Sequence, residues 1–559
     1  MIADPVLSLV HGPPLAEEVG QGAHSIPGFL AELKARHGPR EAIVMRTDRG
    51  RAAWSYDELN ASSVAVASAL IAGGLGKDGR VGVLMANRPE YLAALFGIAM
   101  AGGVTVALST FSTPSELAHL IEASAIQLLL FDTRVAKQDF GVMLRELPPS
   151  PYLRRLVQLD SATDDEPLAP DYEGWDAFLA SGGEVPAALV EARAASVMPS
   201  DAGGIFFSSG TTRLPKGVVH TQRAFCIQWW RWPRVFCMRE PVRSWTGNGL
   251  FWSGNISLVV GTALATGGAA ILQPVFSAGA ALQVIEAEGV SFLAGRPHQW
   301  ARVQGEPDWA SADLSSLKYV TKGDLITEHP SVATAWKTPM AFGTTETMTI
   351  CTAFDEDTSA EDYDGSFGGA LPGNILKIVD PLTLAIKPRG ERGEFCVKGP
   401  TLMTGYLGKT LEQCFDDAGF FCTGDGGFID AAGRFHWEGR LTDMIKTGGA
   451  NVAPEEVDAA IAAFPGVKRT QTVGVPDDLL GEMVVACIVP MAGDTIDEKA
   501  LLAFLKDRLA RFKMPRRVLV LREEEFALTG NEKAKAADIR TVAIGRIASQ
   551  SPPKKAVLF

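Results

Sequence analysis

The stretch RVGVLMANRPEYLAALFGIAMAGGVTVAL, residues 80–108, decides the expected fold. Residues 81–85 form a short apolar run, which is typical of a buried strand. Pro89 follows a polar turn and favours the first turn of a helix, because its fixed φ angle suits that position. Gly102 and Gly103 end that helix, and VTVAL then continues as a β-branched strand.

The order of helix and strand recurs in ELAHLIEASAIQLLLFD, residues 116–132, and this alternation favours an α/β fold with parallel sheets. Short strands with glycine-rich turns near residue 390 predict a small β region. After residue 445, a helix, two strands and an amphipathic helix predict a compact α+β unit. We therefore expect a large N-terminal domain, residues 1–441, and a small C-terminal domain, residues 442–559.

Composition limits the function. The chain has 559 residues, enough for two or three domains, and a net charge of −13 without a long basic run, which excludes nucleic acid as the expected partner. Seven scattered cysteines without a CxxC pair predict reduced, mostly buried thiols in a cytoplasmic protein, with neither a disulfide framework nor a zinc site. The N-terminus lacks a basic start followed by a long apolar segment, so no secretory signal is expected.

The uncharged segment of residues 244–285 resembles a membrane span. Asparagine, glycine and proline interrupt it, whereas a span needs about 20 unbroken apolar residues. A buried helix and strand of a large core is the preferred interpretation, and no integral membrane span is expected.

The segment SSGTTRLPKG, residues 208–217, combines backbone amides, hydroxyls and one lysine, the groups that hold phosphate oxygens. The common nucleotide loop ends in GK[ST] and opens a helix, whereas here Lys216 precedes Gly217 and a second apolar run. That order fits a loop between two strands. An ordinary glycine-rich hairpin is the alternative, because glycine and serine also dominate plain turns.

Four further segments give a more specific pattern: FGTTET at residues 342–347, TGD at 423–425, GRLTDMIKTGGANVAPEEVD at 439–458 and LTGNEKAK at 528–535. In this order and at these separations, they resemble the adenylate-forming superfamily. That superfamily contains acyl- and aryl-CoA synthetases, adenylation domains of peptide synthetases and firefly luciferase. The resemblance covers nearly the whole chain and is closest to a stand-alone acyl-CoA synthetase.

The resemblance implies an ATP site. Hydroxyls and amides of the first loop would hold the β- and γ-phosphates together with Lys216, and Phe342 would stack on the adenine. Asp425 would accept both ribose hydroxyls, with Arg440 assisting. The implied ATP- and AMP-binding residues are Ser208, Ser209, Gly210, Thr211, Thr212, Arg213, Lys216, Gly323, Phe342, Gly343, Thr344, Asp425 and Arg440.

The resemblance also implies the groups that act on the reacting atoms. Two anions meet when a carboxylate attacks the α-phosphorus of ATP, so positive charge must be supplied there. Glu346 would carry Mg²⁺, a cation that prefers carboxylate oxygen, and Thr345 would bond the α-phosphate. Lys533 would bridge the carboxylate and the α-phosphate.

A second pose of the same site is implied for the thiol. The small domain would be mobile and turn about Thr442, the position of the hinge, so that one site runs adenylation and then thioester formation. Lys446, Gly448 and Gly449 would then line the approach of CoA, with the glycines giving room for its pantetheine arm.

Some positions depart from the family pattern. Arg213 replaces a glycine. We interpret the loop as functional but with altered handling of ATP, and the alternative is a loop that has lost its function. Trp252 stands where CoA ligases usually carry a histidine that gates the acyl pocket, which suggests a bulkier gate. Glu532 replaces the glycine before the catalytic lysine. The residues expected to line the acyl pocket are Trp252, Asn255 and His298.

The resulting hypothesis is a cytoplasmic acid–CoA ligase that uses Mg²⁺, ATP and CoA. Its acid would be bulky and neutral, either fatty, aryl or polycyclic, with a role in fatty acid metabolism. Two alternatives stay open: an acyl-AMP ligase that loads a carrier protein, and a degenerate, non-catalytic protein that binds an acyl group or a nucleotide. A homodimer is also left open.

Overall fold

The computed structural model describes residues 6–160, 171–208, 215–295, 297–321, 324–336, 340–355, 358–441, 445–447, 450–477, 480–506, 508–509, 513–526, 528 and 534–550. Contacts divide the chain into two compact units. The larger unit consists of Val10–Ile375 and Val397–Phe421, and the smaller consists of Met1–Leu9, Leu376–Cys396 and Cys422–Phe559. The boundary expected between residues 441 and 442 stays a prediction, since residue 442 lies outside the described residues.

The strand–helix–strand prediction is confirmed in the larger unit. Strands β4 (Arg80–Leu84) and β5 (Val104–Ala107) run parallel, and helix α3 (Pro89–Met100) connects them. Together with six further strands they form a sheet of order β10-β9-β6-β4-β5-β11-β12-β21. The other strands are β10 (Glu173–Gly174), β9 (Arg155–Leu159), β6 (Leu128–Asp132), β11 (Ala202–Ser208), β12 (Lys216–Thr221) and β21 (Gly405–Tyr406).

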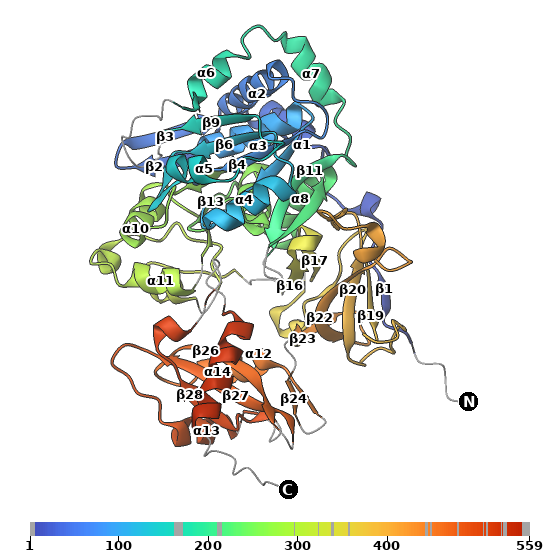
Figure 1. Ribbon diagram of the computed structural model, residues 1–559, viewed down its shortest axis with the longest axis vertical. Helices are drawn as coiled ribbons and strands as arrows, with labels where there is room; N and C mark the ends of the chain where they lie inside the picture. The colour runs from blue at the N-terminus through green and yellow to red at the C-terminus, as the bar shows by residue number, and fades with distance from the viewer. Residues whose placement is uncertain are drawn as a thin grey trace. The chain divides into compact units, whose positions relative to one another are not determined.

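Helices cover both faces of this sheet (Figure 1). Leu128 and Leu130 of β6 pack into the core that contains α2 and α3, whereas Leu129 and Phe131 pack with α4 and α5. Successive side chains of a strand point to opposite faces, so the apolar run of β6 serves two cores. The helices around the sheet are α1 (Ile26–His37), α2 (Tyr56–Ala72), α4 (Pro114–Ala123), α5 (Phe140–Glu146), α6 (Trp175–Ala180) and α7 (Ala187–Ala195).

A second sheet of the larger unit has the order β15-β13-β14-β2-β3, and a third has the order β16-β17-β18. Strands β2 and β3 form an antiparallel hairpin, whereas the pairs β2–β14, β14–β13 and β13–β15 are parallel. The strands are β2 (Glu41–Thr47), β3 (Gly50–Ser55), β13 (Arg243–Thr246), β14 (Ala269–Leu272), β15 (Phe292–Ala294), β16 (Ala341–Thr344), β17 (Thr349–Ala353) and β18 (Gly369–Ala370). The helices beside them are α8 (Gln222–Val235), α9 (Gly261–Ala265), α10 (Ala278–Ala287) and α11 (Pro297–Gln304).

The uncharged segment of residues 244–285 lies in this part of the core, as expected. It contains β13, the π-helical segment η2 (Asn255–Val260), α9 and β14, and most of its side chains are buried. Within the described part of the chain, no helix is long and apolar enough to cross a membrane.

The smaller unit contains the expected β region. Strands β1 (Leu9–His11), β19 (Ile375–Val379), β20 (Gly393–Lys398), β22 (Phe421–Ile429) and β23 (Phe435–Arg440) form one sheet in that order. A disulfide joins Cys396 of β20 to Cys422 of β22. The expectation of seven reduced thiols is therefore wrong for this pair, because neighbouring strands bring together two cysteines that are 26 residues apart. Cys226, Cys414 and Cys487 are free and buried, as expected.

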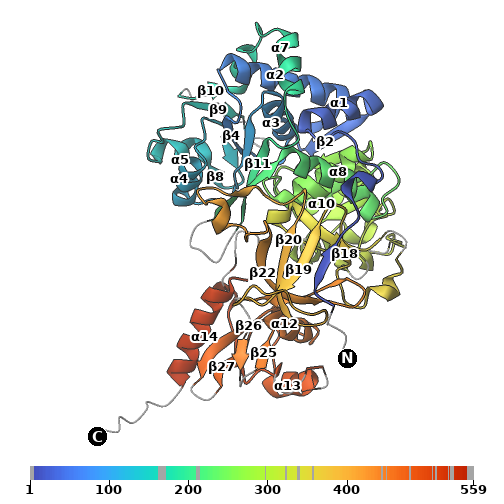
Figure 2. The same cartoon turned by 90° about the vertical axis from the view of Figure 1, so that its right-hand side faces the viewer.

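The compact unit expected after residue 445 is also present. Strands β26 (Val467–Asp477) and β27 (Gly481–Pro490) form a long hairpin, along which helix α14 (Ala536–Gln550) runs (Figure 2). The remaining elements are β24 (Ile445–Thr447), β25 (Ala450–Val452), β28 (Arg517–Val520), α12 (Pro454–Ala462) and α13 (Glu498–Lys506). The α/β fold class with a large N-terminal part and a smaller C-terminal part is thus confirmed.

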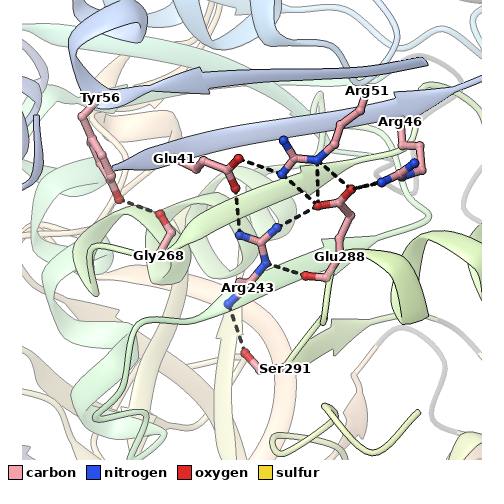
Figure 3. Close-up of polar contacts among 8 residues, drawn as sticks. All are labelled: Glu41, Arg46, Arg51, Tyr56, Arg243, Gly268, Glu288 and Ser291. Atoms are coloured by element: carbon pink, nitrogen blue, oxygen red, sulfur yellow. Dashed lines mark hydrogen bonds and ion pairs between the residues drawn. The ribbon is translucent and has the colours of Figure 1, made fainter. Parts of the chain in front are cut away.

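A charged cluster fastens the second sheet of the larger unit to the end of α10 (Figure 3). Glu288, which is 5% exposed, accepts hydrogen bonds from Arg46 at 2.8 Å, Arg51 at 3.0 Å and Arg243 at 2.9 Å. Glu41 also accepts hydrogen bonds, from Arg51 at 2.7 Å and from Arg243 at 3.2 Å. Burial raises the pKa of Glu288, but the hydrogen bonds from Arg51 and Arg46 outweigh burial and leave that pKa below its ordinary value. The carboxylate is thus held ionised between three strands.

We expect Glu288→Gln to lower the free energy of unfolding at pH 7 by about 3 kcal/mol, because removing one partner leaves buried charges uncompensated. A carboxyl with a lowered folded pKa stabilises the fold above its unfolded pKa, and that stabilisation is lost as the pH falls through the folded pKa. Urea unfolding at pH 7 and pH 4 should therefore show a smaller difference between wild type and variant at pH 4. Glu191→Gln, at an exposed position of α7, is the control. A penalty that stays the same at both pH values would contradict this role.

Candidate active site

The proposed phosphate loop lies between two strands, as its sequence predicts. Strands β11 and β12 are antiparallel, and Ser208 and Lys216 are direct partners at the base of the loop. The tip residues Ser209, Gly210, Thr211, Thr212 and Arg213 lie outside the described residues. Their phosphate contacts, like the effect of Arg213, stay predictions.

The FGTTET motif forms a strained turn. Phe342, Gly343 and Thr344 end strand β16, and a short 3-10 helix, η5 (Thr345–Thr347), follows. Met348 and Thr349 then have φ angles of 48° and 90°, which non-glycine residues rarely adopt, least of all a β-branched one. Gly343 is required by the same turn, since an added Cβ would lie 1.4 Å from the carbonyl oxygen of Thr349.

Three buried side chains hold this turn, two through its backbone and one through the side chain of Thr349. His220 of β12 donates from Nε2 to the carbonyl oxygen of Thr345 at 2.7 Å. Gln228 of α8 donates to the carbonyl oxygens of Thr347 at 3.2 Å and Ile350 at 2.8 Å. Ser257 of η2 lies 3.1 Å from the hydroxyl of Thr349, also within hydrogen-bond distance. Strain of this kind persists only where the surroundings over-determine the backbone, as they do here.

His220 is not among the site residues predicted from the sequence. It is fully buried, and burial lowers its pKa to about 4, although its bond to Thr345 and the nearby Glu346 oppose that shift. Among the described residues, its Nδ1 atom has no hydrogen-bond partner, so a second proton there would be buried without an acceptor. The ring is therefore neutral and carries its proton on Nε2.

Glu346 is held through both its backbone and its side chain. Its carbonyl oxygen accepts a hydrogen bond from the amide of Met403 at 2.7 Å, and its Oε1 accepts one from the hydroxyl of Tyr406 at 2.8 Å. No cluster of three metal-ligating side chains occurs in the described part of the chain. A single half-exposed carboxylate nevertheless suits Mg²⁺, which usually keeps waters and substrate phosphates as its other ligands.

A second cluster lies in the smaller unit, around Asp425 of β22. The carboxylate is 2% exposed, and its Oδ1 lies 3.0 Å from the indole nitrogen of Trp437 and 3.1 Å from Nε of Arg440. Arg440 also donates to the carbonyl oxygen of Thr423 at 2.9 Å. The β22–β23 hairpin places Asp425 opposite Arg440, so the two residues expected at the ribose do meet. Trp437 was missed, and only the register of the hairpin could have indicated it.

Trp252 and Asn255, two of the three residues expected to line the acyl pocket, differ from each other in their burial and contacts. Trp252 is half-buried beside Phe251, with ring centroids 5.0 Å apart. Asn255 is 8% exposed and spans the turn before η2, accepting from Thr246 at 3.3 Å and donating to the carbonyl oxygen of Gly249 at 2.8 Å. Its amide is thus already engaged within the protein. The side chain of His298 lies outside the described part.

The three tryptophans of α8 could serve either core packing or contact with a substrate, and all of them lie in the core. Trp229 and Trp232 are 0% and 5% exposed and donate to the carbonyl oxygen of Ile256 and the hydroxyl of Ser257. Trp230 is 6% exposed and donates to Ala23. Because every indole N–H is bonded inside the protein, packing is the interpretation we favour for this cluster.

The residues expected to act in the second pose are largely outside the described residues. Lys446 lies on β24 with its side chain exposed, and its amide donates to Glu482 at 2.9 Å. The other expected residues that fall outside the description are Gly323, Thr442, Gly448, Gly449 and Lys533. Their roles stay predictions.

Two protein-family models match successive parts of the chain. A family described as AMP-binding enzyme matches residues 30–407, and one described as AMP-binding enzyme C-terminal domain matches residues 456–533. Feruloyl-CoA synthase from Amycolatopsis sp is 31% identical over 519 residues, which cover 91% of this chain and 97% of that protein. Indoleacetate–CoA ligase from Aromatoleum aromaticum is 31% identical over 509 residues, covering 87% and 92%.

Solved structures share the fold. The anthranilate CoA ligase AuaEII, in complex with anthranoyl-AMP, has a TM-score of 0.78 against this chain, with 22% identity over 96% of this chain and 99% of that one. ATP-bound MatB from Rhodopseudomonas palustris has a TM-score of 0.74, with 24% identity over 93% and 99%.

We expect His220→Gln to flatten the dependence of stability on pH, because glutamine can donate to Thr345 without titrating. A histidine with a lowered folded pKa favours the fold above its unfolded pKa of about 6.5, and that contribution declines as the pH falls toward about 4. Between pH 7 and pH 5, wild type should lose about 2 kcal/mol more than the variant. Chemical unfolding at the two pH values measures this, with His11→Gln at an exposed position as the control. Equal losses in wild type and His220→Gln would exclude a neutral, buried His220.

Proposed function

The chain belongs to the AMP-binding enzyme family, and from that premise we propose that it is an ATP-dependent acid–CoA ligase. A carboxylate would attack the α-phosphorus of ATP, giving acyl-AMP and pyrophosphate. The CoA thiol would then attack the acyl carbon, giving acyl-CoA and AMP. The observation that carries the proposal is the Thr345–Glu346 turn, which is bonded directly to β12, the strand that follows the phosphate loop.

The attachment to β12 matters because adenylation depends on position. Lys216 begins β12 and His220 lies four residues further along, so one strand carries the loop lysine and the anchor of Thr345. Groups fixed in this way need no reorganisation when charge develops at phosphorus. Thr345 would donate a hydrogen bond to the α-phosphate. The adenine of ATP would lie against Phe342, Gly343 and Thr344.

The cluster around Asp425 would hold the ribose. A carboxylate whose orientation is fixed by Trp437 and Arg440 can accept hydroxyl hydrogens without first losing side-chain freedom. We assign this recognition to Asp425, supported by the two neighbours.

Magnesium, bound together with ATP, would offset the charge of the phosphates, and Glu346 would hold it. A half-exposed carboxylate with a fixed backbone and one engaged oxygen is suited to that task. Lys533 would stabilise the charge that develops between the carboxylate and the α-phosphate. The small domain, residues 442–559, would turn about Thr442, after which Lys446, Gly448 and Gly449 would meet CoA.

We propose a bulky neutral acid as substrate. Half-buried Trp252 offers apolar surface at the expected pocket, and two relatives are named for feruloyl-CoA and indoleacetate, which contain aryl acids. A ligase from Mycobacterium tuberculosis named for a polycyclic propanoyl group is 30% identical over 88% of this chain and 94% of its own length. Aryl and polycyclic acids are therefore preferred to fatty ones.

Carrier-protein loading is the alternative for the thiol step. We also propose a cytoplasmic location, and a homodimer is left open. We infer an active enzyme in preference to a degenerate binding protein, because the holders of the Thr345–Glu346 turn are complete.

Incubation with ATP, Mg²⁺ and a panel of acids should release pyrophosphate only when an accepted acid is present. Addition of CoA should convert the acyl-AMP into acyl-CoA, identified by mass. Aryl or polycyclic acids should give at least about tenfold higher kcat/KM than acetate, because each buried methylene contributes about 0.8 kcal/mol. Acyl-AMP that reacts with an acyl carrier protein but not with CoA would favour the alternative, and no pyrophosphate with any acid would refute adenylation.

Lys533→Ala should abolish acyl-AMP formation but spare thioester formation from supplied acyl-AMP, since Lys533 is assigned to the first pose alone. Loss of a positioned charge should slow adenylation by about 100-fold or more. The two half-reactions are measured separately, with Lys535→Ala as a nearby lysine control. Equal losses in both half-reactions would contradict a separate role for Lys533.

A further inference from the structure

We infer that Tyr406 is a positioning residue that keeps Lys216 and Glu346 apart and orients the Glu346 carboxylate for the metal-bound nucleotide. The inference rests on the proposed function, in which Lys216 meets phosphate and Glu346 meets Mg²⁺. It follows from two contacts of one side chain. The Tyr406 hydroxyl donates to Oε1 of Glu346 at 2.8 Å, and the Lys216 ammonium lies 5.4 Å from the centre of the Tyr406 ring.

The backbone around Tyr406 is fixed by the sheet. Strand β21 pairs antiparallel with β12, with Tyr406 opposite Val218. The amide of Thr404 donates to Val219 at 2.9 Å, and the amide of Leu407 donates to Gly217 at 2.8 Å. Because the backbone is hydrogen-bonded to β12 on both sides of Tyr406, the pairing of the two strands sets the direction of the Tyr406 side chain.

The same segment holds Glu346. Met403 donates its amide to the carbonyl oxygen of Glu346 at 2.7 Å, and three residues later Tyr406 binds the carboxylate. A hydrogen bond to a charged acceptor is stronger than one between neutral groups. With Oε1 held by the hydroxyl, the orientation of the carboxylate is restrained, and Glu346 would meet a cation without first losing side-chain freedom.

The ring has a second effect, on Lys216. An ammonium group is attracted to the face of an aromatic ring within about 6 Å. Opposite charges in one site would otherwise gain by pairing with each other, which would occupy both groups before a ligand arrives. Among the described residues, Lys216 and Glu346 form no ion pair, and Tyr406 contacts both. Tyr406 thus leaves each charge available for ligand.

Two substitutions separate the hydroxyl from the ring. Tyr406→Phe keeps the ring and removes only the hydrogen bond to Glu346. We expect the magnesium concentration for half-maximal adenylation to rise about tenfold, the factor that corresponds to about 1.4 kcal/mol, while kcat at saturating magnesium changes less than about twofold. Tyr406→Leu removes the ring as well and should also raise the KM for ATP. Thioester formation from supplied acyl-AMP should be unchanged in both.

A double-mutant cycle with Glu346→Gln tests whether Tyr406 acts through Glu346. Once the carboxylate is gone, Tyr406→Phe should have little further effect, so the two effects should not add. Phe421→Leu, which alters a ring whose centroid is 6.2 Å from that of Tyr406, is the packing control and should leave the magnesium dependence unchanged. Additive effects, or an equal shift in Phe421→Leu, would overturn the inference.

Binding of Mg²⁺–ATP, measured by calorimetry on the full chain, keeps this test independent of turnover. If wild type binds the nucleotide but accepts no acid, the proposed function fails while a weaker affinity in Tyr406→Phe still supports the role of Tyr406. If Tyr406→Phe binds Mg²⁺–ATP as tightly as wild type at every magnesium concentration, the role of Tyr406 is refuted even though the ligase activity stands. Wild type that binds no Mg²⁺–ATP would refute both.

Discussion

The backbone of Met348 and Thr349, with φ angles of 48° and 90°, is the constraint on which the FGTTET segment depends. Each such residue costs about 1–3 kcal/mol, and a β-branched threonine has no local means of relieving the strain. The turn keeps its form because strand β12, helix α8 and the π-helical segment η2 each contribute a side chain that binds it. The orientation of Thr345 and Glu346 is a product of these long-range contacts.

Ser257, one of the residues that contact the turn, is itself fixed by hydrogen bonds from the tryptophans of α8. Ser257, which contacts Thr349, accepts the indole hydrogen of Trp232, and Trp229 donates to the backbone one residue earlier. These tryptophans are buried, so the large apolar area of α8 stabilises the same segment that reaches the turn. The geometry of the turn and the packing of the core are therefore coupled, and substitutions in the α8 core should alter the position of Glu346.

Local signals in the sequence were sufficient for the elements and for the loop between β11 and β12. Pro89 and Gly102 mark the bounds of α3, and the apolar runs mark parallel strands, because these features depend on neighbouring residues. Pairing across a sheet depends on register between distant segments, which a single sequence does not display. Several contacts depend on such pairing of distant segments: those of Trp437, Tyr406 and His220, and the Cys396–Cys422 disulfide. The resemblance predicted roles for Asp425 and Glu346, whereas the residues that contact them, Trp437 and Tyr406, appeared only in three dimensions.

The π-helical segment Asn255–Val260 has an evolutionary consequence. A π turn contains one residue more than an α turn, so it can arise from an α-helix by a single insertion and revert by a single deletion. Such a deletion would rotate what precedes the segment by about 100° relative to α9. Trp252 lies just before the segment, while the sheets on either side would keep their register. A one-codon change in length could thus change the direction of the side chain at position 252 in related chains without changing the order of the strands.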